Sequence, residues 1–141
     1  MPFENRKNGD YKMKIWKQED VNKVLPDKNG VRHYPANSSF AEWCRFAKGC
    51  SFAEGCSFAE WCSFAGKKAI STPPFVRVNN IGSHSDGCTI FNLESGLFVQ
   101  CGCVFCSVEE FLEKVEKTHG DNKYTKQYFM AVELAKITFG F

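Results

Sequence analysis

Hydrophobic residues recur every six positions through the middle of the chain. Residues 40–65 read FAEWCR, FAKGCS, FAEGCS, FAEWCS and FA, so each hexad begins with Phe-Ala and carries Cys in its fifth place. The frame extends upstream, with Tyr34 in the phenylalanine place and Ser38 in the cysteine place, and downstream to Ile70, after Lys68 in the cysteine place. A period of six does not fit a helix and predicts short extended segments joined by corners. In each segment, the Cys and the Phe two residues later face the same side of the strand.

The hexads resemble the hexapeptide motif of left-handed parallel β-helices, in which an apolar residue and a small residue open each repeat and a small residue returns in the fifth place. The resemblance implies three hexads per coil, so that residues 34–69 make two coils whose strands stack about 4.8 Å apart. The cysteines then become small inward fillers beside the aromatic rings. Pentapeptide-repeat solenoids are the alternative, but their period is five. The expected inward ladders are Tyr34–Phe52–Ile70, Phe40–Phe58 and Phe46–Phe64.

The segments that flank the repeat are expected to cap it, because a short solenoid exposes unpaired strand edges at both ends. Residues 11–25 predict a short strand and a helical turn, and residues 27–33 predict a turn. Residues 73–74 are Pro-Pro and mark a boundary. The N-terminal cap segment is therefore placed at 1–33 and the repeat at 34–70.

Residues 71–141 are expected to form a β-hairpin and two-helix module. Ser107 with Glu110 is typical of a helix start, Gly120 of a helix end, and Asp121 is expected to cap the next helix. The predicted elements are strands at 75–81, 88–93 and 97–105 and helices at about 107–119 and 122–138. The expected fold is thus mainly β with C-terminal helices, a short left-handed parallel β-helix capped by this module.

Composition narrows the class of protein. Eighteen basic and sixteen acidic residues give the 141-residue chain a formal charge of +2, which argues against a DNA-mimicking surface and gives only weak support to non-specific nucleic-acid binding. No specific nucleic-acid partner is expected. No apolar run is long enough for a membrane span, and no basic start precedes an apolar core as in a signal peptide. The eight cysteines are therefore expected to be reduced thiols or metal ligands in a cytoplasmic protein.

The outward hexad positions supply the candidate binding residues. Trp43 and Trp61 are expected to stack at one corner of the coil, with Glu42 and Glu60 beside them and Arg45 near by. The pattern favours an aromatic patch that packs on the protein's own terminal segments or on a neighbouring subunit. The alternative is a stacking platform for a planar ligand such as a nucleobase. Stacked carboxylates need a basic partner, which is expected from Lys48, from another segment or from another chain.

Other residues are weaker candidates for a metal, anion-binding or catalytic site. The cysteines outside the hexads do not have a standard zinc spacing, and packing is favoured over a metal site. The loop at 82–87 (GSHSDG) could bind an anion through its backbone N–H groups with Arg77, Lys67 and Lys68, but it lacks the features of a P-loop. His33 and His84 are expected to be ordinary surface residues, and His119, which precedes the helix-ending Gly120, can interact with the C-terminal end of that helix. The four cysteines outside the hexads, considered above as metal ligands, are Cys88, Cys101, Cys103 and Cys106.

Residues 34–139 resemble small proteins of bacteriophages and mobile elements that often carry Phe-Ala-x-x-Cys repeats. The resemblance is most specific in IGS (81–83), CGC (101–103), SVEEF (107–111) and THGDN (118–122). These pieces bring no established catalytic role. The resemblance implies an accessory protein in the cytoplasm of an infected bacterium, for which counter-defence is a common role.

The sequence therefore predicts a non-enzymatic, homo-oligomeric binding protein without cofactor, metal or membrane anchor. It would sequester a nucleotide-type immune signal or block a host defence protein, and the β-helix resemblance implies a trimer. The alternatives are a hexapeptide-repeat acyltransferase-like enzyme, with His33 or His84 as its base, and a structural trimerisation protein. The candidate ligand-binding or interface residues are Trp43, Trp61, Arg45, Glu42, Glu60, Lys48, Arg77 and His84.

Overall fold

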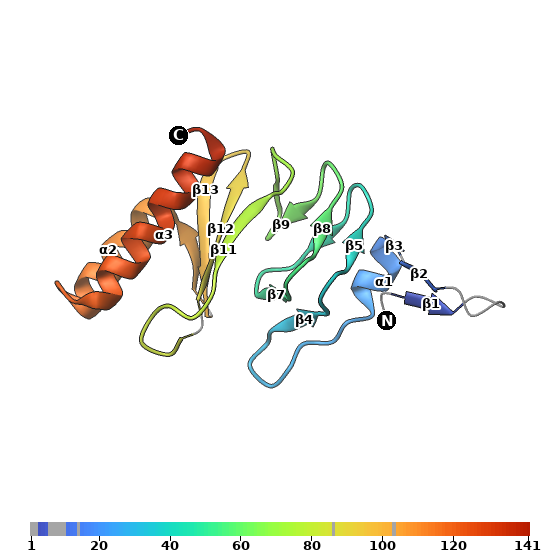
Figure 1. Ribbon diagram of the computed structural model, residues 1–141, viewed down its shortest axis with the longest axis horizontal. Helices are drawn as coiled ribbons and strands as arrows, with labels where there is room; N and C mark the ends of the chain where they lie inside the picture. The colour runs from blue at the N-terminus through green and yellow to red at the C-terminus, as the bar shows by residue number, and fades with distance from the viewer. Residues whose placement is uncertain (1–2, 6–10, 14, 86, 103) are drawn as a thin grey trace. The chain divides into compact units, whose positions relative to one another are not determined.

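The computed structural model describes residues 3–5, 11–13, 15–85, 87–102 and 104–141. It divides into two compact units, unit 1 (Met1–Pro73) and unit 2 (Pro74–Phe141). Most of the short strands of unit 1 come from the hexads (Figure 1). The elements of unit 1 are β1 (Phe3–Asn5), β2 (Tyr11–Met13), β3 (Ile15–Trp16), α1 (Gln18–Asn22), β4 (Arg32–Tyr34), β5 (Ser39–Phe40), β6 (Arg45–Phe46), β7 (Cys50–Phe52), β8 (Ser57–Phe58), β9 (Ser63–Phe64) and β10 (Lys67–Lys68).

Strands three hexads apart pair in parallel. Strand β4 pairs with β7, β5 with β8, and β6 with β9. The inward rings of each pair stack: Tyr34 on Phe52 with centroids 5.2 Å apart, Phe40 on Phe58 at 5.0 Å, and Phe46 on Phe64 at 5.3 Å. These three pairs of the predicted ladders are confirmed.

Both ends of the stack are covered by short segments. At the N-terminal end, β3 pairs in parallel with β5, and Trp16 lies 5.6 Å from Phe40 between ring centroids. At the other end the chain turns back through Ala65 and Gly66, both with positive φ, and β10 pairs antiparallel with β9. The prediction that Ile70 continues the ladder above Phe52 is wrong, because this reversal takes the chain out of the repeat and leaves Ile70 59% exposed.

The interior between the ladders is filled by aromatic rings and thiols. The Phe46 ring is 2% exposed and lies 4.9 Å from Phe40 and 5.0 Å from Phe52, both in edge-to-face contact. Aromatic edges favour the faces of neighbouring rings, so layers of stacked pairs can turn their edges to one another. The filler thiols are buried at Cys44, Cys50 and Cys62 and half-buried at Cys56.

Unit 2 is an antiparallel sheet with two helices on one face (Figure 1). Residues Ile90 and Val99 of the sheet pack with Phe111 and Val132 of the helices in one buried cluster. Strand order in the sheet follows chain order. The elements are β11 (Phe75–Val78), β12 (Cys88–Leu93), β13 (Gly96–Cys101), β14 (Val104–Ser107), α2 (Val108–His119) and α3 (Lys123–Phe139).

Two details of unit 2 differ from the sequence-based prediction. The predicted strand 97–105 is divided into β13 and β14, which pair antiparallel, and Gly102 between them has a φ of +59°. The second helix is capped by Asn122, whose Oδ1 accepts from the backbone N–H groups of Tyr124 and Thr125, and not by Asp121. The Ser107 cap is confirmed, since its Oγ accepts from the Glu110 N–H at 3.2 Å.

The architecture is mainly β with helices at the C-terminal end, as the hydrophobic pattern predicts. Within the described residues, no helix combines the length and the apolar character needed to cross a membrane.

Candidate functional site

The fourth residue of each of the five hexads from residue 34 to residue 63 turns the corner between two strands in the left-handed region of φ. Glycine fills this place at Gly49 and Gly55, as expected for a residue without a Cβ. Trp43 and Trp61 adopt the same conformation, with φ of +66° and +70°. For a residue with a side chain, this conformation costs roughly 1–2 kcal/mol. Two bulky residues therefore occupy strained positions, a feature that clusters at functional sites in proteins.

The two tryptophans stack on each other and remain open to solvent. Their ring centroids are 5.5 Å apart with an interplanar angle of 17°. The backbone N–H of Trp43 donates to the Glu60 carbonyl oxygen at 3.2 Å, which ties the two corners together. The Trp43 side chain is 59% exposed and that of Trp61 44% exposed, so the described residues do not cover them. We call this pair the tryptophan corner.

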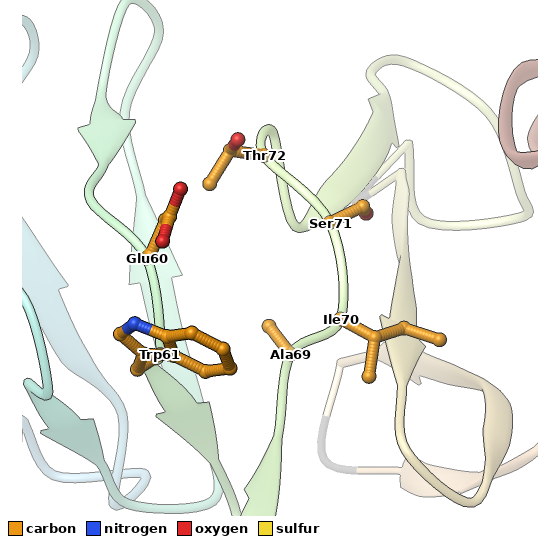
Figure 2. A pocket seen from close by; sticks show the side chains of 6 residues that line it. All are labelled: Glu60, Trp61, Ala69, Ile70, Ser71 and Thr72. Atoms are coloured by element: carbon orange, nitrogen blue, oxygen red, sulfur yellow. The ribbon is translucent and has the colours of Figure 1, made fainter.

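A pocket of about 250 Å³ lies beside Trp61. Figure 2 shows Glu60 and Trp61 on one side of it and the segment from Ala69 to Thr72 on the other. The Lys68 Nζ lies 5.0 Å from the centroid of the Trp61 ring, a distance typical of a cation–π contact. The pocket therefore combines an aromatic wall with a carboxylate and two hydroxyl side chains, and has an ammonium group near by.

The expected basic partner of the two corner carboxylates is not found within the described residues. No ion pair of the described chain involves Glu42 or Glu60, and Lys48 lies beside Gly49 in the following hexad. A partner from another chain stays a prediction. The cation near the tryptophan corner is Lys68. In the sequence, Lys68 is distinguished by its position, since it occupies the fifth place of its hexad, where the four preceding hexads carry cysteine.

The remaining candidates belong to other parts of the structure. Arg45 lines a different hollow of unit 1, together with α1. Arg77 and His84 belong to unit 2. The Arg77 Nε donates to Asn79 Oδ1 at 2.9 Å and its Nη1 to Thr89 Oγ1 at 2.8 Å, so this guanidinium is already bound in the sheet.

The loop at 82–87 uses several of its backbone N–H groups internally. Gly82 donates to the Gln127 side chain at 2.8 Å, Ser85 to the Gly82 carbonyl at 3.1 Å and Gly87 to the Ile81 carbonyl at 3.1 Å. These three groups are therefore not directed at an anion. Asp86 of this loop lies outside the described residues.

The histidines proposed for the acyltransferase alternative do not line either hollow of unit 1 described here. His33 is on the surface of β4, where its Nε2 lies 2.8 Å from Asp27 Oδ2. This hydrogen bond holds the pKa of the Asp27 carboxyl below its ordinary value. His84 is exposed in its loop.

The cysteines of unit 2 are packing residues in the described part of the chain. Cys88 is fully buried, and its burial raises the pKa of its thiol to about 12. The Cys101 Sγ contacts the Gly87 carbonyl at 3.4 Å and the Tyr128 hydroxyl at 3.5 Å. Among the described residues, no group of three or more potential ligands gathers as a metal site. Cys103, the fourth cysteine considered from the sequence, lies outside those residues.

The buried thiols make the stability of the protein sensitive to alkaline pH. Burial raises the pKa of the Cys62 thiol from 9.0 to about 11, and it raises those of Cys44, Cys50 and Cys56 in the same direction. The unfolded chain releases these protons near pH 9, whereas the folded chain retains them. We therefore expect full stability below about pH 9 and a decline above it, as the unfolded chain loses these protons first.

Urea unfolding in the presence of a reductant, repeated between about pH 8 and 10.5, measures this decline. The Cys62→Ser variant keeps a hydrogen-bond donor but has no thiol to titrate, so its decline should be shallower. A free energy of unfolding that stays constant over this interval would contradict the prediction.

No family model, curated protein or solved structure matches the chain. The geometry of the tryptophan corner and the pocket beside it therefore carries the functional argument.

Proposed function

We propose that this chain is a non-enzymatic binding protein that holds a planar, nucleobase-type ligand at the tryptophan corner. The observation that carries the proposal is the exposed stack of Trp43 and Trp61 in a backbone conformation where the intervening hexads use glycine. Burial in the core does not account for large side chains there, because their backbone is strained and about half of each residue is exposed. A base stacked on a tryptophan contributes about 1–3 kcal/mol to binding, which offsets that strain once the ligand is bound.

The residues of the pocket beside Trp61 favour some nucleobases over others. The Glu60 carboxylate accepts hydrogen bonds only, so it suits an exocyclic amino group such as those of adenine, guanine and cytosine. Uracil offers no amino group to this acceptor. The ammonium group of Lys68 adds positive charge near the ring and favours an anionic ligand such as a nucleotide over the neutral nucleoside.

The wider role proposed for this site is that of a phage-type accessory protein that sequesters a nucleotide immune signal. Its support is the sequence resemblance together with a site built for binding. In this proposal, residues 34–69 form two coils of a left-handed parallel β-helix, which the parallel pairing of β4 with β7, β5 with β8 and β6 with β9 supports. Side-by-side trimers would bring three tryptophan corners into one assembly.

Calorimetric titration with adenosine, guanosine, cytidine and uridine, and with their 5′-monophosphates, tests the proposed ligand class. The Trp61→Gly variant removes the aromatic wall and places at φ +70° the residue that suits it, so the fold is retained. We expect it to lose about tenfold or more in affinity, the value of one stacking contact. The Glu60→Gln variant is expected to show a smaller preference for adenosine, guanosine and cytidine over uridine than the unaltered protein does.

The matched control is Leu25→Ala, which removes an exposed apolar side chain of unit 1, 80% exposed, that does not line the pocket. It should bind as the unaltered protein does. The proposal is wrong if no nucleoside or nucleotide binds, or if Trp61→Gly binds them with unchanged affinity. In the first case, the exposed aromatic surface would favour the other version of the role, contact with a host defence protein.

A further inference from the structure

A second hollow of unit 1, of about 380 Å³, lies between α1 and the strands β4 and β6. It is separate from the pocket beside Trp61, with which it shares no lining residue. Its lining includes two arginines but no acidic residue. The residues that line this hollow include Gln18, Asn22, Arg32, Tyr34, Arg45 and Ala47.

We propose that this arginine hollow binds a phosphoryl group through the guanidinium groups of Arg32 and Arg45. Two guanidinium groups that line one hollow repel each other unless an anion lies between them. Within the described chain, neither side chain forms an ion pair or a hydrogen bond. The planar fork of N–H donors on arginine matches the geometry of phosphate oxygens.

The place of Arg32 in the repeat indicates that packing does not require it. Arg32 pairs in register with Cys50, so it occupies the inward filler place that Ser38 and the hexad cysteines hold elsewhere. Burial raises the pKa of the Cys50 thiol, and Arg32 is among the neighbours that offset part of this rise. Arg32 is thus a half-buried residue in a filler position, where a short polar or thiol side chain would suffice for packing.

The walls of the arginine hollow are held in place by α1. The Arg45 N–H donates to Gln18 Oε1 at 2.6 Å, and Gln18 Nε2 donates to the Arg45 carbonyl at 3.0 Å and to Asn22 Oδ1 at 2.9 Å. The Tyr34 hydroxyl donates to the Val21 carbonyl at 3.3 Å. These bonds hold the Arg45 backbone and the Tyr34 side chain against α1, so two walls of the hollow are formed before a ligand arrives, which lowers the entropic cost of binding.

Titration with inorganic phosphate and with ribose 5-phosphate, followed by NMR of the arginine side chains, tests the proposal. Both Arg32→Gln and Arg45→Gln are expected to weaken binding about tenfold or more, since each removes charge-assisted hydrogen bonds. Arg32→Lys keeps the positive charge but lacks the planar pair of N–H donors. Its affinity for phosphate should lie between that of the glutamine variants and that of the unaltered protein. If ribose 5-phosphate binds more tightly than inorganic phosphate, the ligand is a phosphomonoester; the reverse order identifies free phosphate.

Lys48→Gln is the charge-matched control, because Lys48 does not line the hollow. It should leave phosphate binding unchanged. The proposal is overturned if neither phosphate compound binds at low ionic strength, or if Lys48→Gln weakens binding as much as Arg32→Gln. The Trp61→Gly variant should bind phosphate normally, and Arg32→Gln should bind adenosine normally, so failure of one site is distinguishable from failure of the other.

Discussion

Replacing Phe46 by alanine is expected to lower the free energy of unfolding of unit 1 by about 3–5 kcal/mol, the usual cost of removing a buried phenylalanine ring. The Phe46 ring is 2% exposed and stacks on Phe64 at 5.3 Å between centroids. It also meets Tyr34, Phe40, Phe52 and Phe58 within 5.7 Å. Its loss would leave a cavity among rings that belong to three different sheets, and such rings cannot fill it without moving their strands.

Intrinsic tryptophan fluorescence during urea unfolding measures this effect in unit 1 alone. The chain has three tryptophans, and Trp16, Trp43 and Trp61 all lie in that unit. Phe46→Leu keeps most of the volume and should cost clearly less, while Leu25→Ala at an exposed position should cost less than about 0.5 kcal/mol. A loss below about 1 kcal/mol for Phe46→Ala would show that the rings do not form a close-packed core.

The second large effect is expected at Gly87 in unit 2. Its φ is +75°, and a Cβ added there would overlap the Val78 carbonyl oxygen and press on the Cα of Asn79. Both neighbours are backbone, so no side-chain rotation relieves the overlap. Gly87→Ala is therefore expected to destabilise unit 2 by about 3 kcal/mol or more, from left-handed strain together with overpacking.

The matched control is Gly140→Ala, because Gly140 has a φ of +80° and a Cβ there meets open space. It isolates the conformational cost, expected at about 1 kcal/mol. The helical signal in far-UV circular dichroism follows unit 2, since α2 and α3 have 12 and 17 residues and α1 has five. If Gly87→Ala and Gly140→Ala lowered the free energy of unfolding of unit 2 equally, the predicted overlap with Val78 would be contradicted.

The hexad pattern was sufficient to predict the strands of the repeat and their partners. Once Phe recurs every six residues without a slip, Phe40 must meet Phe58 and Phe46 must meet Phe64 if three hexads return the chain to the same side. The ends of the repeat were harder to predict. Ile70 fits the pattern as well as Tyr34 does, and only the positive φ of Ala65 and Gly66 takes the chain into the antiparallel strand β10.

The site was predictable in part for the same reason. The spacing of Trp43 and Trp61 predicts their stacking, but it does not show that the corner uses left-handed backbone or that a pocket opens beside Trp61. Lys68 was missed as a neighbour of Trp61 because its contact depends on the chain reversal at β10. Arg32 was missed because its place before the first regular hexad hides its equivalence to Cys50.

The pairing of residues eighteen positions apart has a consequence for how this chain could evolve. A gain or loss of six residues would rotate every later hexad by one side and carry Trp61 away from Trp43. A gain or loss of eighteen would leave each side aligned and change only the number of layers. Duplication of a segment of that length would therefore add a third ring to the stack of Trp43 and Trp61 without a new fold.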